Sequence, residues 1–433
     1  MINPTIFALS TAPGKAGIAI VRVSGNKSFT VMKALVGTVL IPRKATLCYL
    51  TYLNDLIDQA IVICFKANNS YTGEDMVEFH VHGSNAVIKN LSEILGNGFG
   101  LLIANPGDFT RRALENGCLD LSQVEGILDL IRSETKAQQK QALKSLSGSI
   151  GNKSYEWREL LLNVLSYCEI MIDFSDQDVP NDTTDEIKRS LFLLLNELEK
   201  ELKSYKSSEL VRDGFDIVII GKPNVGKSSL LNYLAGKEKA IVSEHAGTTR
   251  DLLELSIDLG GYRVNFFDTA GIHLSKNIIE QIGIDRAIKK SKEAFIKIFL
   301  LENNDLPDSF GLSVEPNDLL LGAKNDVQNH SRYLGVSGKT GKGVNELLEE
   351  ITKKIKKQTT YSSVLINERH KKIIESTISC LCLAQNEIEL ENFRIEIVAE
   401  CVRSAIIQLD LLVGKINVED VLGNIFSSFC IGK

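Results

Sequence analysis

The sequence lacks several features that mark metal-binding, secreted or membrane-spanning proteins. Its eight cysteines include no CxxC pair, which argues against a zinc site, and unpaired thiols suit a reducing compartment. No apolar run reaches the about 18 residues that a membrane span needs, and the N-terminus carries no signal-peptide pattern. We therefore expect a soluble, cytoplasmic protein with no membrane partner.

A positive net charge is also absent. The 49 lysines and arginines are outnumbered by 55 aspartates and glutamates, which gives a formal net charge of −6. Proteins that hold nucleic acid alone are usually basic, so a nucleic-acid partner would need a local patch or a second protein. The 44% of hydrophobic residues is ordinary for a globular protein, and 433 residues suffice for two or three domains.

Periodicity divides the chain into four segments. Residues 1–117 mix strand and helix patterns, and residues 118–212 have helical periodicity. Strands and helices alternate over residues 213–357, and helical periodicity returns over residues 358–433. The economical interpretation is one helical domain split by an inserted α/β domain, because insertion is tolerated where the ends of the host segments lie close together.

Local patterns predict individual elements. Runs within Ala16–Gly25, Asp58–Ala67 and Met76–Gly83 are predicted strands, and Ser84–Leu95 is a predicted helix with Ser84 as its N-cap. Two further predictions concern helices: one long helical pattern over residues 119–146, and a solvated helix face over Lys289–Ile298.

The stretch "FDIVIIGKPNVGKSSLLNYLAG" (Phe215–Gly236) contains an apolar strand, a glycine-rich loop and an amphipathic helix. It fits the P-loop pattern G-x-x-x-x-G-K-[ST] with Gly221, Gly226, Lys227 and Ser228. In such a loop the backbone N–H groups surround phosphates, the lysine neutralises β/γ charge, and the serine hydroxyl binds Mg²⁺. The alternative is an ordinary β-turn-α unit, which the flanking strand and helix make improbable.

Two later motifs indicate a GTPase. "VNFFDTAG" (Val264–Gly271) ends an apolar strand at Asp268, which is suited to hold Mg²⁺ through water, and Gly271 can meet the γ-phosphate. "HAGTTRD" lies between this motif and the P-loop and offers Thr249 as a second Mg²⁺ hydroxyl. This order of motifs resembles that of small GTPases. A glutamine that orients water follows D-x-x-G in Ras-like enzymes, whereas Ile272 occupies that position here.

The guanine-reading motif N-K-x-D is matched with one departure. Lys324 and Asp326 fit, but Ala323 replaces the first asparagine and removes a supporting contact. Asp326 can accept two hydrogen bonds from guanine that adenine cannot donate, so we expect guanine selectivity with modest affinity. The last guanine-site loop is matched by Ser337, Gly338 and Lys339.

Taken together, these motifs and several others resemble one family, the tRNA-modifying GTPases called MnmE or TrmE. The resemblance covers nearly the whole chain. It rests on the GTPase motifs and on "GIAIVRVSG", "SYTGEDMVEFHVHG" (Ser70–Gly83), "NPGDFTRRALENGCLDLSQVEGILDLI" (Asn105–Ile131) and the C-terminal "LGNIFSSFCIGK" (Leu422–Lys433).

The resemblance implies an α/β plus α fold with three domains. Residues 1–117 would form an α+β, tetrahydrofolate-binding-like dimerisation domain, and residues 213–357 a Ras-like P-loop G domain inserted between the helical segments 118–212 and 358–433. It also implies a potassium-dependent GTPase that forms a homodimer and a heterotetramer with the flavoprotein MnmG. The pair would install a (carboxymethyl)aminomethyl group at C5 of the wobble uridine, position 34, of certain tRNAs. The one-carbon unit would come from 5,10-methylene-tetrahydrofolate, and the site would also accept the 5-formyl form.

The resemblance further implies roles for residues of the G domain. Glu280 would orient the attacking water, and Ser228 and Thr249 would bind Mg²⁺. Potassium would be held by Asn224, Ser243, His245 and Thr248. The remaining GTP-binding positions implied by the family are Val225, Gly226, Lys227, Ser229, Asp268, Thr269, Ala270, Gly271, Lys324, Asp326, Ser337, Gly338 and Lys339.

Outside the G domain, the resemblance implies a folate site made by Arg22, Glu78 and Lys433. Cys118 stands where the family usually carries lysine, so a cation is lost there. The family's catalytic cysteine falls on Cys430, close to the chain end.

Other interpretations compete with this one. A regulatory GTPase of ribosome assembly shares the GTPase motifs but lacks the folate-like first segment and the CIGK end. A non-hydrolysing folate-binding or scaffold protein is favoured if Ala323 and Cys118 mark decay, although the intact P-loop argues against that. His80 and His82 share one strand face, where supporting roles are more common than metal binding.

Overall fold

Of the 433 residues, the computed structural model describes 3–173, 182–236, 241, 254–268, 290–302, 305, 312–360, 363–414, 425–426, 429 and 432. The chain divides into two compact units. The first unit comprises Met1–Leu128, Ser145–Glu159 and Ile406–Lys433, and the second comprises Asp129–Lys144 and Leu160–Ala405.

The first unit contains a six-stranded sheet with the order β3-β4-β5-β2-β1-β6. Neighbouring strands are antiparallel except for the parallel pair β1 and β6. The strands are β1 (Ile6–Leu9), β2 (Ala16–Ser24), β3 (Thr46–Tyr52), β4 (Asp55–Phe65), β5 (Met76–Gly83) and β6 (Leu102–Ile103). The predicted strands within Ala16–Gly25, Asp58–Ala67 and Met76–Gly83 are therefore confirmed.

Buried and less buried side chains alternate along these strands, so the sheet has one face in the core and one open face. Val21, Val23 and Phe79 are fully buried and belong to one core with residues of helices α1 (Ser28–Val36) and α2 (Asn85–Glu93). Side chains at the positions between them lie on the opposite face, because successive residues of a strand point to opposite sides. Helix α2 follows Ser84, whose extended backbone fits the predicted N-cap, and continues into a π-helical turn over Ile94–Gly98.

The second unit contains a sheet of the order β12-β11-β10-β7-β9-β8, parallel except for β8. Its strands are β7 (Phe215–Gly221), β8 (Glu254–Leu259), β9 (Tyr262–Asp268), β10 (Ile296–Leu301), β11 (Leu319–Gly322) and β12 (Leu334–Gly335), with helices α8 (Lys227–Ala235) and α10 (Val344–Gln358). In a parallel sheet the carboxyl ends of the strands meet at one edge, where nucleotides bind in such folds. Together with the helices below, this arrangement confirms the α/β plus α fold class.

One prediction for this unit is wrong. The second half of the run Lys289–Ile298 is not a solvated helix face, because β10 begins at Ile296 in the middle of the sheet. Lys297 is almost fully buried and its ammonium pairs with Glu315 at 2.8 Å and Asp318 at 3.4 Å. The four lysines in the run are typical of a solvated helix face, but pairing with carboxylates makes a buried lysine tolerable.

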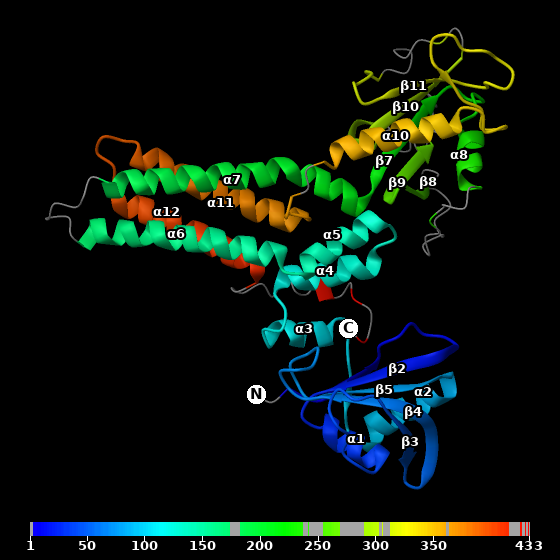
Figure 1. Ribbon diagram of the computed structural model, residues 1–433, viewed down its shortest axis with the longest axis vertical. Helices are drawn as coiled ribbons and strands as arrows, with labels where there is room; N and C mark the ends of the chain where they lie inside the picture. The colour runs from blue at the N-terminus through cyan, green and yellow to red at the C-terminus, as the bar shows by residue number, and fades with distance from the viewer. Residues whose placement is uncertain are drawn as a thin grey trace, which may run out of the picture. The chain divides into compact units, whose positions relative to one another are not determined.

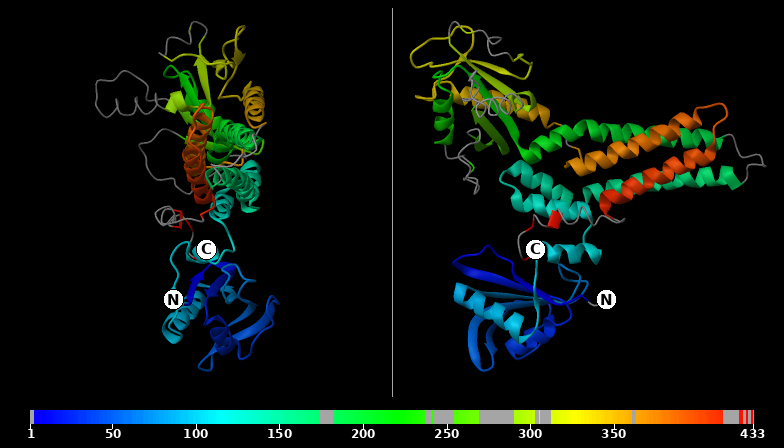
Figure 2. Two further views of the ribbon diagram at one scale, coloured as in Figure 1. Left: turned by 90° about the vertical axis from the view of Figure 1, so that its left-hand side faces the viewer. Right: turned by 180° about the vertical axis from the view of Figure 1, so that it is seen from behind.

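Helices that precede the second sheet in the chain pack against helices that follow it. Figures 1 and 2 show α7 (Asp182–Asp213) beside α11 (Glu368–Ile388), and α6 (Ser149–Asp173) beside α12 (Ile395–Val413). The Ser154 hydroxyl donates to the Leu409 carbonyl at 3.1 Å, which links the second of these pairs. None of the helices in the described part of the chain is long and apolar enough to span a bilayer.

The predicted long helix over residues 119–146 is in fact two helices, α4 (Leu121–Arg132) and α5 (Lys136–Leu146). Thr135 and Gln138 form a reciprocal cap at the start of α5: the Gln138 side-chain oxygen accepts from the Thr135 backbone N–H at 3.1 Å, and Gln138 N–H donates to the Thr135 hydroxyl at 3.5 Å. Such T-x-x-Q boxes begin helices, which explains the break. A short helix, α3 (Asp108–Glu115), precedes α4 in the first unit.

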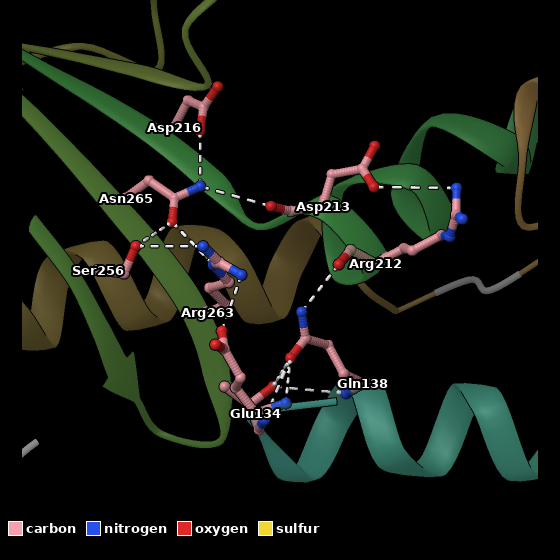
Figure 3. A network of polar contacts seen from close by, with 9 residues as sticks. Glu134, Gln138, Arg212, Asp213, Asp216, Ser256, Arg263 and Asn265 are labelled. Atoms are coloured by element: carbon pink, nitrogen blue, oxygen red, sulfur yellow. Dashed lines mark hydrogen bonds and ion pairs between the residues drawn. The ribbon is translucent and has the colours of Figure 1, made fainter. Parts of the chain in front are cut away.

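A polar network joins the start of α5 and the end of α7 to the parallel sheet within the second unit (Figure 3). Arg263 of β9 donates to Glu134 at 2.8 Å and to the Asn265 side-chain oxygen at 3.1 Å. The Asn265 amide donates to Asp216 at the start of β7 at 2.9 Å, and Gln138 donates to the Arg212 carbonyl at 2.8 Å. These hydrogen bonds give partners to polar groups that would otherwise be buried without one.

Candidate functional site

The glycine-rich loop connects a buried strand to a helix. Strand β7 is apolar over most of its length and ends at Gly221, and α8 begins at Lys227. Between them, Gly226 has φ +111° and Asn224 has φ +59°. Glycine adopts positive φ freely, and asparagine is among the few other residues that do so at low cost. The sequence GKPNVGK therefore fits the tight turn that a phosphate-binding loop requires.

Lys227 lies inside this loop rather than in solvent. Its side chain is almost fully buried, and its ammonium donates to the Gly221 carbonyl at 2.9 Å and the Lys222 carbonyl at 3.0 Å. Burial lowers the pKa of Lys227, and the negative charge of Asp268 partly offsets that effect. Because the charge of Asp268 offsets the burial of this cation only in part, a further anion is favoured here, which is the role predicted for this lysine.

Ser228 and Asp268 meet at the carboxyl edge of the parallel sheet. The Ser228 hydroxyl donates to Asp268 Oδ2 at 2.8 Å. Asp268 is 2% exposed, and its other oxygen, Oδ1, has no hydrogen-bond partner within the described ranges. An unpartnered buried carboxylate oxygen beside a serine hydroxyl fits a hard cation such as Mg²⁺, which prefers oxygen ligands.

The loops predicted to read the base also lie together. The Asp326 side chain accepts a hydrogen bond from Ser337, which lowers the pKa of Asp326 and keeps its carboxylate ionised. Gly338 approaches α8 so closely that a Cβ there would lie 2.4 Å from the Leu230 backbone nitrogen. The structure thus brings Asp326 and Ser337 together and places their loops against the helix that follows the P-loop.

Several predicted site residues lie outside the described residues. In the G domain these are Ser243, His245, Thr248, Thr249, Thr269, Ala270, Gly271, Ile272 and Glu280, and at the chain end they are Cys430 and Lys433. Their predicted roles remain predictions.

In the first unit, Arg22 and Glu78 form an ion pair on the open face of the sheet. They are direct cross-strand partners on β2 and β5. Arg22 Nε and Nη2 donate to Glu78 Oε1 at 3.0 Å and 2.9 Å, and each side chain is 14% exposed. The guanidinium also lies over the rings of Tyr71 and Phe109, with centroid distances of 5.2 Å and 5.6 Å. Strand register therefore explains why these two predicted folate residues meet.

The chain end reaches the same place. Arg22 Nη1 and the Ser10 hydroxyl both donate to the Gly432 carbonyl at 3.1 Å. Gly432 has φ +99°, and a Cβ there would lie 2.4 Å from the Leu9 carbonyl, so a side chain would not fit. Phe426 and Phe429 are buried in one core with Val124 of α4. Phe426 and Phe429 thus anchor the tail on the helical segment, and Gly432 provides the turn that follows them.

Three further residues of the first unit have contacts of their own. His80 Nε2 lies 3.2 Å from Glu78 Oε2, which agrees with a supporting role, whereas His82 Nδ1 lies 2.7 Å from Asp58. Cys118 is exposed, and its sulfur lies close to the backbone at Gly73. A Cβ at Gly73 would be 2.9 Å from that sulfur. Within the described residues, no group of three or more His, Cys, Asp or Glu side chains could hold a metal ion.

Sequence reasoning missed the aromatic surroundings of Arg22 and the backbone acceptor at Gly432. Tyr71 lies inside the quoted run Ser70–Gly83, but nothing in the sequence pairs it or Phe109 with Arg22. The Gly432 carbonyl could not be found from residue type, because every residue carries a backbone carbonyl.

Comparison with known proteins places the chain in a family. A family model described as the MnmE helical domain matches residues 121–430, and one described as the GTP-binding protein TrmE N-terminus matches residues 5–118. A "tRNA modification GTPase MnmE" of Dinoroseobacter shibae is 43% identical over 430 residues, covering 99% of this chain and 100% of the relative. Proteins of the same name from Cereibacter sphaeroides, 44% identical over 99% of this chain and 100% of the relative, and from Brucella anthropi, 40% identical over 100% and 99%, also match. Among solved structures, Era of Aquifex aeolicus matches 32% of this chain and 56% of its own, with 24% identity and a TM-score of 0.27. The matches over the full length of the MnmE relatives show that this chain belongs to the MnmE family of tRNA modification GTPases.

Proposed function

We propose that this chain hydrolyses GTP to GDP and acts with the flavoprotein MnmG in the cytoplasm. Together they would install a (carboxymethyl)aminomethyl group at C5 of the wobble uridine, position 34, of certain tRNAs. The observation that carries the GTPase half of the proposal is the buried Asp268 oxygen left without a partner beside Ser228. The relatives' name, tRNA modification GTPase, supports the substrate class.

The P-loop side chains would divide the work of binding GTP. The Lys227 ammonium would exchange its two carbonyl partners for β- and γ-phosphate oxygens. Ser228 and Thr249 would hold Mg²⁺ directly, with Asp268 behind them. When bound, the ion supplies positive charge that stabilises the phosphates as they separate. Asp326 would select guanine through its ionised carboxylate.

Potassium dependence is proposed because Ile272 cannot orient water as glutamine does. The Asn224 side chain is exposed on the loop, where it is available to a monovalent cation together with Ser243, His245 and Thr248. Glu280 would then orient the attacking water.

The test compares GTP hydrolysis in potassium and in sodium. We expect strong stimulation by potassium that Asn224→Ala abolishes, and a lower kcat in Glu280→Ala with nucleotide affinity nearly intact. Equal rates of the unaltered protein in the two salts would refute potassium dependence.

The site at Arg22 and Glu78 is proposed to bind 5,10-methylene- or 5-formyl-tetrahydrofolate, with Lys433 as a third contact. Glu78 offers a carboxylate to the N–H donors of a pterin, and Arg22 holds that carboxylate in place.

The anchoring of Gly432 beside Arg22 supports an active role for the neighbouring Cys430. We expect Cys430→Ser to abolish tRNA modification with MnmG while GTP hydrolysis persists. Normal modification by that variant would make the thiol structural.

A homodimer, and a heterotetramer with MnmG, complete the proposal. The open face of the sheet in the first unit exposes Ile18, Leu47, Tyr49 and Ile61, each 40–65% exposed. Leu47 and Ile61 are cross-strand partners, and neighbouring exposed apolar residues support association with another protein surface. We expect a dimer in analytical ultracentrifugation and a shift toward monomer in Leu47→Lys. An unaltered protein that sediments as a monomer would contradict the homodimer.

A further inference from the structure

The guanine motif of this chain lacks its first asparagine, and Ala323 in its place is fully buried. A methyl group can donate no hydrogen bond, so Ala323 supports the motif only through its backbone, whose N–H donates to the Leu301 carbonyl at 2.8 Å. The second half is held by Asn325, whose amide donates to the Gly335 carbonyl at 3.0 Å, and by the bond from Ser337 to Asp326. Neither contact reaches Ala323.

His330 supplies a contact to the first half. Its Nε2 lies 2.6 Å from the Ala323 carbonyl oxygen. Since a carbonyl oxygen can only accept, Nε2 carries the proton and donates. The imidazole is half-buried and comes from the loop that follows the motif, seven residues further along the chain.

The position of the imidazole depends on a glycine at the end of β11. A Cβ at Gly322 would lie 2.2 Å from the ring carbon Cγ and 2.5 Å from Cδ2 and Nδ1 of His330. The ring therefore lies directly against the backbone at Gly322, and any side chain there would displace it. We call this contact of His330 with Gly322 and with the Ala323 carbonyl the brace, because it holds the backbone at the start of the motif.

We propose that His330 is a positioning residue for guanine recognition: it fixes the backbone at Ala323 so that Asp326 faces the base. The inference rests on the proposed role of Asp326 as the residue that reads guanine. His330 does not touch the base itself. It acts through the carbonyl of Ala323, in a chain whose motif has lost the asparagine that would give support.

The experiment measures GDP and ADP affinity by calorimetry on the full chain in Mg²⁺ and potassium. His330→Phe keeps an aromatic ring but has no N–H, whereas His330→Gln keeps an N–H donor without the ring. We expect His330→Phe to weaken GDP about fivefold to tenfold, as expected for one lost hydrogen bond, with ADP unchanged. His330→Gln should retain most of the GDP affinity. The control is Arg332→Ala, an exposed side chain of the same loop, which should behave as the unaltered protein.

A second variant tests the same brace from the other side. Gly322→Ala should displace the imidazole and lower the ratio of GDP to ADP affinity as His330→Phe does. The proposal is overturned if His330→Phe lowers GDP and ADP affinity equally, since a general loss of structure affects both nucleotides. It is also overturned if His330→Phe binds GDP normally while His330→Gln does not, because packing and not donation would then be decisive.

The role of Asp326 is tested separately. Asp326→Ala should remove the preference for GDP over ADP. If Asp326→Ala keeps that preference, the assignment of the base-reading motif is wrong, whatever the His330 variants show. If Asp326→Ala loses it and His330→Phe does not, only the role of His330 is wrong.

Discussion

The P-loop and the cluster around Arg22 are assembled from the chain in opposite ways. Lys227 bonds to Gly221 and Lys222, which lie six and five residues earlier, so both contacts stay within one strand–turn–helix segment. Arg22 bonds to Glu78, 56 residues away, and to Gly432, 410 residues away.

The difference concerns what each site depends on. The contacts that shape the P-loop lie within one short segment. A substitution there should therefore change ligand binding with little effect on folding. The cluster around Arg22 forms where two strands and the chain end meet, so a substitution there should change binding and stability together. Four predictions test this contrast.

The largest effect is expected for Lys227→Ala. The variant loses the cation that faces the β- and γ-phosphates, which should weaken GTP about 100-fold, a loss of about 3 kcal/mol for charge-assisted hydrogen bonds. Because burial already lowers the pKa of Lys227, its charge adds no stability to the nucleotide-free protein, and the melting temperature should be nearly unchanged. Calorimetric titration and thermal unfolding measure the two quantities. A lowered melting temperature with normal GTP affinity would break the contrast.

Arg22→Met should reduce both folate affinity and stability. Glu78, 14% exposed, would keep His80 but lose its cation, at a cost of about 3 kcal/mol for breaking a mostly buried pair. The double variant Arg22→Met with Glu78→Leu removes the uncompensated charge and should recover much of the stability without recovering folate binding. Urea unfolding and folate titration separate the two effects, and a double variant no more stable than Arg22→Met would show that the ion pair is not the cause.

Ser10→Ala should have a smaller effect, confined to the chain end. Its hydroxyl donates to the Gly432 carbonyl, a contact worth about 1 kcal/mol, so the tail should open more often. We expect carboxypeptidase to remove the last residues about fivefold faster, since the rate follows the population of the open tail. Thr11→Ala is the control, because the Thr11 hydroxyl accepts from Ile20 and not from the tail. Equal digestion of both variants and the unaltered protein would mean that the tail is held elsewhere.

The smallest effect is expected at His82, which lies on the same strand as Glu78 but pairs with Asp58 instead of with Arg22 or Glu78. Burial raises the pKa of Asp58, but hydrogen bonds from the His82 backbone and side chain and from Gln59 outweigh it, so the pKa lies below 3.8. Asp58 therefore stabilises the fold fully above pH 3.8, and this contribution is lost as the pH falls through the lower value in the folded state. His82→Leu should cost less than about 1 kcal/mol near neutrality and should reduce the loss of stability on acidification. Urea unfolding at several pH values measures this, and an unchanged pH dependence would contradict it.

These regions also show how far the sequence predicts the site. The P-loop, the strand ending at Asp268 and the base-reading loops could be located because each is a contiguous motif with its own local geometry. Sequence also placed Arg22 and Glu78 in one site, but only through resemblance to a family. Their cross-strand register and the ring contacts around Arg22 required the structure, because no local pattern encodes which strands become neighbours.

By itself, the sequence determined three strands of the first unit, the glycine-rich loop and the family, since hydrophobic periodicity and turn residues act over a few positions. Tertiary structure decided the rest. It buried Lys297 within a sheet by supplying two carboxylates from a distant loop, and it placed the His330 imidazole against Gly322. It also brought the Gly432 carbonyl to Arg22. Such contacts depend on groups far apart in the chain, and their free energy is gained only when the whole fold holds those groups together.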